Sequence, residues 1–153
     1  MKTPENQTPN LLLVDDDPDM IRLLTSVICC APDVEFDAES LTDAVDARRR
    51  IEQGGIDILV TDLEMPGVSG LELLRCAKSR NPATQVLFMT GHSTQEALLD
   101  ALEQGASDYL LKPVNQLELL QLLRHAFERQ QRWKQALLGT WRGRNVREAA
   151  TTN

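Results

Sequence analysis

The sequence lacks the features on which membrane, secreted and disulfide-stabilised proteins depend. No apolar run approaches the roughly 18–20 residues that a membrane-spanning helix needs. The opening residues, MKTPENQTPN, have no apolar centre, so they do not resemble a secretory signal. Cys29, Cys30 and Cys76 show no metal-ligand spacing, and the adjacent pair is poorly placed to form a disulfide. We therefore expect reduced thiols and a cytoplasmic protein.

Positive charge is scarce in most of the chain and concentrated near its end. The 153 residues carry a net charge of −7. Residues 1–123 hold 9 Lys and Arg against 21 Asp and Glu, whereas residues 124–147 hold 7 against 1. An acidic body is a poor match for a phosphate backbone, so no direct binding of nucleic acid is expected.

Short apolar runs alternate with segments of helical spacing, which predicts an α/β fold. Strands are predicted at residues 11–15, 34–38, 56–61, 85–90 and 108–111. Helices are predicted to begin at Pro18, at Ser40, around Leu71, and after capping boxes at 93–96 and 115–118. The last helix is predicted to run to about Leu138. Five strict β-α units predict a five-stranded parallel sheet with helices on both faces.

Polar residues follow several of these strands, where the carboxyl ends of a parallel sheet form one edge. Asp15 and Asp16 follow the first strand, Asp62 the third, Thr90 the fourth and Lys112 the fifth. Adjacent carboxylates raise one another's pKa unless a cation lies among them. Oxygen donors without nearby Cys or His favour Mg²⁺, with Mn²⁺ as an alternative. Asp62 at the end of the central strand is the best-placed nucleophile for a phosphoryl group.

Four motifs together resemble the receiver domain of two-component response regulators. VDDD at 14–17, TDLEMPGVSG at 61–70, Thr90-Gly91 and LLKP at 110–113 occur in the family's order and spacing. The resemblance covers roughly residues 10–128 and implies a CheY-like, flavodoxin-like (βα)5 doubly wound sheet with strand order 2-1-3-4-5. It leaves residues 1–9 as a flexible N-terminus and residues 129–153 as a basic C-terminal helical extension or linker.

The resemblance implies a role for each acid of the predicted cluster. Asp62 corresponds to the aspartate that is phosphorylated, and it also ligates Mg²⁺. Asp16 corresponds to a direct Mg²⁺ ligand, and Asp15 to the acid that supports the ion through water. Glu64 would contribute its backbone carbonyl to the metal. Asp17 is predicted to cap the helix that begins at Pro18.

Three further positions correspond to the family's phosphate-contact and switch residues. Thr90 and Lys112 match the hydroxyl and ammonium that meet the phosphoryl group. Tyr109 matches the aromatic side chain whose rotamer changes with the hydroxyl residue, although a tyrosine that merely fills the sheet edge fits the pattern too. The peptide between Lys112 and Pro113 resembles one that is cis in the family. Gly91 stands where alanine is usual, and this difference should not block access.

The implied function is a phosphoacceptor that is not itself an enzyme beyond its own phosphorylation and dephosphorylation. A histidine kinase or phosphotransfer protein would supply the phosphoryl group. His92 and His125 are isolated and lack the sequence context of a kinase's phosphorylated histidine. The output would be a protein or domain that contacts the fourth helix, fifth strand and fifth helix, or the C-terminal tail. A phosphorylation-dependent homodimer is a further expectation.

Two other functions fit parts of the sequence. The tail from Trp133 has apolar residues at roughly helical spacing with arginines between them, which suits an adaptor whose phosphorylation is only modulatory. The same tail also fits a plain linker. Acids with Mg²⁺ also fit a phosphatase with an aspartyl nucleophile, but Asp62-Leu63-Glu64 has Glu where such enzymes place a second Asp.

Overall fold

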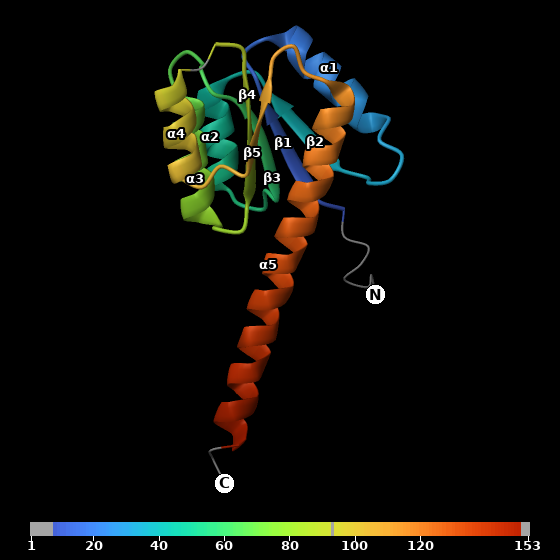
Figure 1. Cartoon of the computed structure of the whole chain (residues 1–153). Helices are drawn as coiled ribbons and strands as arrows, with labels where there is room; N and C mark the ends of the chain where they lie inside the picture. The colour runs from blue at the N-terminus through green and yellow to red at the C-terminus, as the bar shows by residue number, and fades with distance from the viewer. Residues whose placement is uncertain (1–7, 93, 151–153) are drawn as a thin grey trace.

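The computed structural model describes residues 8–92 and 94–150, with side chains as far as residue 140, and it forms a sheet covered by helices on both faces (Figure 1). The sheet is parallel throughout and has the order β2-β1-β3-β4-β5, as predicted. Its strands are β1 (Asn10–Val14), β2 (Asp37–Leu41), β3 (Ile58–Asp62), β4 (Gln85–Thr90) and β5 (Asp108–Leu111).

Five helices connect and follow these strands. They are α1 (Pro18–Cys29), α2 (Ala44–Glu52), α3 (Gly70–Arg80), α4 (Gln95–Glu103) and α5 (Gln116–Ala150). α1 and α5 cover one face of the sheet, and α2, α3 and α4 cover the other (Figure 1). This arrangement is the doubly wound α/β fold that strictly alternating β-α units favour.

The core has two halves because successive residues of a strand face opposite sides of the sheet. In β1, Leu12 packs toward α2 and α3, whereas Leu11 and Leu13 pack toward α1 and α5. All three are at most 1% exposed, and they lie on a strand with a neighbour on each side. Continuous apolar runs in the sequence therefore mark the inner strands.

The second strand and helix begin later than the sequence predicted. The predicted strand at residues 34–38 is observed at Asp37–Leu41, and the helix predicted from Ser40 begins at Ala44 after the cap residue Asp43. β2 is an edge strand whose first four residues are exposed, so it lacks the apolar pattern that identifies inner strands. Phe36 produced the apparent alternation, but it packs against the α1 and α5 side from the preceding loop.

Side-chain caps begin the helices. Asp17 accepts a hydrogen bond from the Asp19 backbone N–H, which confirms its predicted capping role. Thr94 caps α4, and Ser93 of the predicted capping box lies outside the described residues. Asn115 accepts from the Glu118 backbone N–H at the start of α5. No helix in the described ranges is both long enough and apolar enough to cross a membrane.

α5 is longer than predicted and continues as one helix beyond the body of the domain (Figure 1). The predicted end near Leu138 was wrong, because the helix passes Gly139 and reaches Ala150. A glycine inside a helix costs only about 1 kcal/mol, and the surrounding Leu, Ala, Gln and Arg residues favour helix.

A partly buried polar cluster holds α5 to the sheet where the helix leaves the domain. The Asp57 carboxylate accepts hydrogen bonds from the Asn10 backbone N–H at 2.8 Å, Gln130 Nε2 at 2.6 Å and Lys134 Nζ at 3.0 Å. Asp57 immediately precedes β3, and Asn10 begins β1, so one carboxylate joins two strands to the helix. Gln130 is fully buried. The neighbouring Arg129 guanidinium donates a hydrogen bond to the carbonyl of Ser107, just before β5.

Candidate functional site

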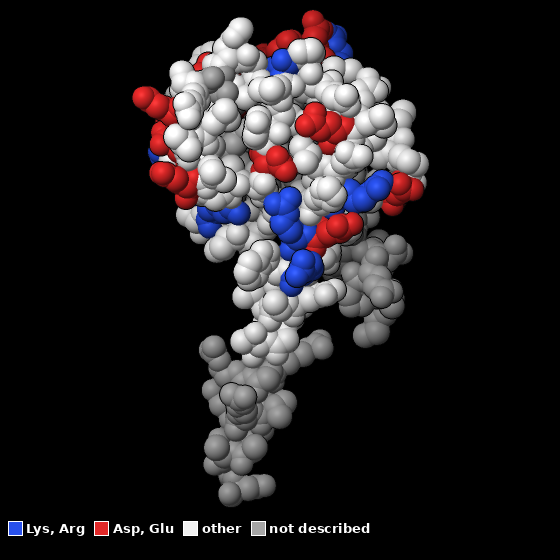
Figure 2. All heavy atoms as spheres, in the orientation of Figure 1, with Lys and Arg blue, Asp and Glu red and all other residues white. Residues whose placement is uncertain are grey.

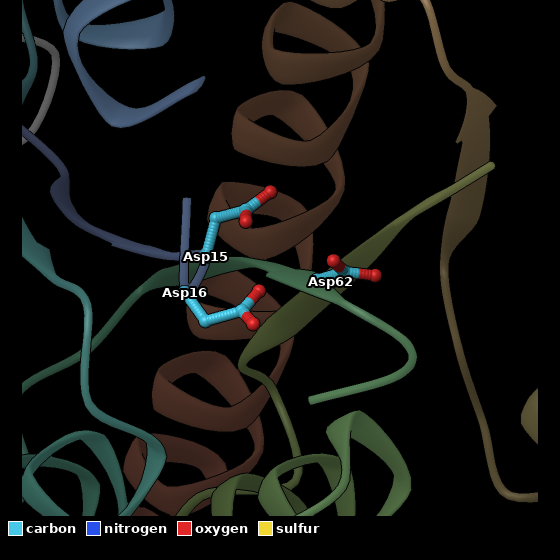
Figure 3. Close-up of side chains that lie close together, drawn as sticks. All are labelled: Asp15, Asp16 and Asp62. Carbon is cyan, nitrogen blue, oxygen red and sulfur yellow. The ribbon is translucent and has the colours of Figure 1, made fainter. Parts of the chain in front are cut away.

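The carboxyl ends of β1 and β3 bring three carboxylates together. Asp15 and Asp16 follow β1, Asp62 ends β3, and their side chains converge on one space (Figure 3). One oxygen from each carboxylate can be chosen so that all three lie within 4.8 Å of one another. The parallel register aligns Val14 with Thr61, so the two acidic positions are held by backbone hydrogen bonds of the sheet.

The three acids differ in exposure and in hydrogen bonding. Asp15 is fully buried, and its two oxygens accept from the Asp17 backbone N–H at 2.9 Å and from Lys112 Nζ at 2.8 Å. Asp62 has a side chain that is 13% exposed and accepts from the Glu64 backbone N–H at 3.2 Å. Asp16 is exposed. Asp15 is thus held by protein donors, whereas Asp16 is open to an added ligand.

Lys112 supplies a cation to this cluster. Its Nζ lies 2.8 Å from Asp15 Oδ2 and 3.0 Å from Asp62 Oδ2, across 97 and 50 residues of sequence. Burial alone would lower the Lys112 pKa, but the hydrogen bonds and charges of the two carboxylates outweigh burial and raise it. Lys112 is therefore a permanent ammonium at neutral pH. The peptide bond between Lys112 and Pro113 is cis, as predicted.

The charges of the cluster do not balance among these residues. Three carboxylates face one ammonium. Asp16 is exposed, but nearby protein atoms displace part of the water around its carboxylate, and this loss of water, followed by the charge of Asp15, raises its pKa. A group whose charged form is disfavoured in this way gains from a nearby cation. The donor set contains oxygen alone, which fits a hard ion such as Mg²⁺.

The other predicted residues lie on β4 and β5 or directly after β3 and β4. Thr90 ends β4 and is 2% exposed, and its carbonyl accepts from the Lys112 backbone N–H at 2.8 Å. An added Cβ at Gly91 would lie 3.8 Å from the Lys112 side chain, so alanine would fit there. Tyr109 on β5 has its side chain exposed beside α4. The Glu64 N–H already contacts Asp62, and the metal-ligand role of its carbonyl stays a prediction.

Gly70 belongs to the site, although sequence reasoning did not single it out. An added Cβ at Gly70 would lie 2.3 Å from the Asp62 carbonyl oxygen and 2.9 Å from Leu63 Cα. The Gly70 N–H donates to the Leu63 carbonyl at 3.0 Å. The first turn of α3 therefore packs directly against the backbone that carries Asp62. The sequence GVSG has the composition of an ordinary turn, and nothing in it indicates a close backbone approach.

Comparisons with known proteins agree with this geometry. The family model described as "Response regulator receiver domain" matches residues 11–124. The response regulator protein PilR of Pseudomonas aeruginosa is 32% identical over 112 residues, which cover 73% of this chain and 24% of PilR. The DNA-binding transcriptional regulator NtrC of Escherichia coli is 42% identical over 79 residues, which cover 52% of this chain and 17% of NtrC.

A solved structure shows the same architecture. The CheY-like response regulator receiver domain protein from Methanospirillum hungatei superposes with a TM-score of 0.76 at 25% identity. The match covers 82% of this chain and 98% of that one. The chain thus spans a quarter or less of PilR and NtrC and nearly all of a separately solved receiver domain.

Proposed function

The chain belongs to the response regulator receiver domain family of two-component signalling, and from this membership we propose that Asp62 is its phosphoacceptor. The observation that supports this assignment most directly is the convergence of Asp15, Asp16 and Asp62 with the Lys112 ammonium. Asp62 is the member at the end of the central strand β3, and its side chain is partly open to solvent. We propose residues 10–128 as the receiver unit and residues 129–153 as a basic extension.

The proposed reaction is phosphoryl transfer from a phosphohistidine of a kinase or phosphotransfer protein. An Asp62 carboxylate oxygen forms a bond to phosphorus while the bond between phosphorus and the imidazole nitrogen breaks. The imidazole leaves with the electron pair of that bond and takes up a proton. Lys112, already 3.0 Å from Asp62 Oδ2, offsets charge on the transferring oxygens, and Thr90 offers a hydroxyl nearby.

A divalent cation, Mg²⁺ or Mn²⁺, is the cofactor that this donor set suits. Bound there, it would neutralise charge on the phosphoryl oxygens. Asp16 and Asp62 would ligate it, the Glu64 carbonyl would complete the protein ligands, and Asp15 would act through water. The engagement of both Asp15 oxygens by Asp17 and Lys112 supports this division of roles.

We further propose that the output is a change in protein contacts near Tyr109. A phosphoryl group on Asp62 would draw Thr90 toward it, and Tyr109 on the neighbouring strand would change rotamer. Its exposed ring beside α4 supports a role at a partner surface. The added charge would shift an existing equilibrium between two arrangements of α4, β5 and α5.

The test uses a small acyl phosphate as phosphodonor with Mg²⁺ and intact-mass spectrometry. The full chain should gain one phosphoryl group, and Asp62→Asn should gain none. Asp46→Asn on α2, whose exposed carboxylate lies outside the site, is the matched control and should be labelled normally. Removing Mg²⁺ with a chelator should prevent labelling. Labelling of Asp62→Asn at the rate of the unaltered chain would refute the assignment.

A further inference from the structure

The residues just after Asp62 form a segment whose backbone is fixed from several sides. The Leu63 N–H donates to the Met89 carbonyl at 3.1 Å, and the Leu63 carbonyl accepts from the Gly70 N–H at 3.0 Å. Leu63 is 3% exposed, and the Glu64 N–H donates to the Asp62 carboxylate at 3.2 Å. These contacts to β4, to α3 and to Asp62 itself limit where the Glu64 carbonyl can lie.

Thr61 holds the Asp62 carbonyl from within β3. Its hydroxyl donates to the Asp62 carbonyl oxygen at 3.0 Å, and the residue is fully buried. Leu59, two residues earlier, packs toward α2 and α3, so Thr61 faces the same side of the sheet. A buried hydroxyl that loses its hydrogen bond costs free energy, so this contact fixes the rotamer of Thr61 together with the direction of the Asp62 carbonyl.

Gly70, the first residue of α3, packs against the same carbonyl. An added Cβ there would lie 2.3 Å from the Asp62 carbonyl oxygen, 2.9 Å from Leu63 Cα and 2.9 Å from Phe88 Cε1. Two of these three neighbours are backbone atoms, which cannot give way unless the backbone that carries Asp62 shifts. We call Thr61 and Gly70 the carbonyl clamp, because both meet the backbone carbonyl of Asp62.

We propose that Thr61 and Gly70 are positioning residues for a divalent cation at the acidic cluster, and this inference rests on the proposed function. Gly70 has no side chain and the Thr61 hydroxyl is bonded to a carbonyl, so neither is itself a ligand. They act through the Asp62 backbone, which sets the place of the Asp62 carboxylate and of the Glu64 carbonyl, both proposed ligands. Groups that orient metal ligands typically contribute about 10- to 100-fold to metal affinity. The clamp should therefore govern the affinity for Mg²⁺ and leave phosphoryl transfer at saturating Mg²⁺ nearly unchanged.

The test measures Mg²⁺ binding to the full chain by isothermal titration calorimetry, without a phosphodonor. Thr61→Val keeps the shape of the side chain and removes its hydroxyl, and Gly70→Ala adds the overlapping Cβ. Acidic side chains also gather along the edge of the molecule over α4 (Figure 2), so weak binding outside the site has to be subtracted. Asp16→Asn removes a proposed ligand and defines this background. Circular dichroism checks that each variant is folded.

Both variants of the carbonyl clamp should weaken Mg²⁺ binding without slowing the chemical step. Thr61→Val and Gly70→Ala should each bind Mg²⁺ about tenfold more weakly than the unaltered chain. Labelling with an acyl phosphate over a series of Mg²⁺ concentrations then separates affinity from chemistry. The Mg²⁺ concentration that gives half of the maximal labelling rate should rise by the factor found in calorimetry. The maximal rate should stay within about twofold, because Lys112 and Thr90, which are proposed to meet the phosphoryl group, are unaltered.

Two further variants separate positioning from a general loss of stability. Ile51 is 1% exposed and lies near the end of α2. Ile51→Ala should lower the free energy of unfolding and keep the affinity for Mg²⁺. Gly70→Ala combined with Phe88→Leu relieves the overlap with the ring while it keeps the overlap with the Asp62 carbonyl. This double variant should therefore bind Mg²⁺ as weakly as Gly70→Ala alone.

Different results would overturn different parts of the proposal. Unchanged Mg²⁺ affinity in Thr61→Val or in Gly70→Ala, beside an unaltered chain that binds Mg²⁺, would remove that residue from the clamp and leave the proposed function intact. An equal loss of affinity in Ile51→Ala would make the effect one of stability, and recovery with Phe88→Leu would assign it to core packing. A lower maximal rate at unchanged half-saturation would place the effect in phosphoryl transfer instead. An unaltered chain that neither binds Mg²⁺ nor accepts a phosphoryl group would refute the proposed function and this inference together.

Discussion

Replacing Asp57 should destabilise the fold, although this residue lies at the opposite end of β3 from the acidic cluster. Its carboxylate accepts three hydrogen bonds, and its side chain is only 14% exposed. Asp57→Ala would leave the Asn10 N–H and the buried Gln130 amide without their acceptor. Each unpaired buried donor costs about 1–3 kcal/mol. The Lys134 ammonium is 35% exposed and can turn to water, so its loss adds little. We expect a loss of about 2–6 kcal/mol in the free energy of unfolding.

Urea unfolding followed by circular dichroism measures this loss, with tryptophan fluorescence as a second probe of the α5 extension. Asp33→Ala is a suitable control, because Asp33 also pairs with an arginine of α5, Arg124, at 2.7 Å. The Asp33 side chain is 63% exposed and the Arg124 side chain 45%, so loss of this ion pair should cost no more than about 1 kcal/mol. Equal stabilities for Asp57→Ala and Asp33→Ala would refute the reasoning that burial makes the difference.

Two further predictions concern the acidic end of the sheet. Gly70→Ala should lower the free energy of unfolding by about 1–3 kcal/mol in chemical denaturation, because its Cβ would overlap the Asp62 carbonyl; unchanged stability would contradict the close approach. Asp16→Asn should raise stability at neutral pH without Mg²⁺, because the raised pKa of Asp16 means that its charged form is disfavoured in the folded state. This gain should shrink as the pH falls through the raised pKa toward the ordinary value of 3.8, because protonation then removes the unfavourable Asp16 charge from the unaltered chain as well. A gain that stays constant with pH would contradict the assignment of the effect to the Asp16 charge.

The sequence was most informative where strands are buried on both sides. β1, β3 and β4 appear as apolar runs because helices cover both of their faces, and polar residues after such runs must lie at one edge. Asp15, Asp62 and Lys112 were predicted to meet on this basis. In the structure, the Lys112 ammonium lies within hydrogen-bond distance of both carboxylates. The parallel direction of the strands followed from the strict alternation of strands and helices, whereas their order was implied by the resemblance to receiver domains.

The sequence was least informative where burial is one-sided or where partners are distant. β2 was misplaced by three residues because an exposed edge strand carries no apolar signal. Asp57 passed unnoticed because its partners Gln130 and Lys134 are 73 and 77 residues away in the sequence. Gly70 was missed because a close backbone approach leaves no trace in composition.

The two ends of β3 show how an aspartate that stabilises the fold differs from one suited to chemistry. Before the strand, Asp57 meets one ammonium, one amide and one backbone N–H, so its charge and its lone pairs are satisfied by the protein. At its end, Asp62 shares a single ammonium with Asp15 while Asp16 stands beside them. Of the two ends of β3, the Asp62 end is therefore the one with unbalanced negative charge, and an added cation would stabilise the fold there. Substitution of Asp57 should accordingly change stability and leave phosphorylation intact, and substitution of Asp62 should remove phosphorylation.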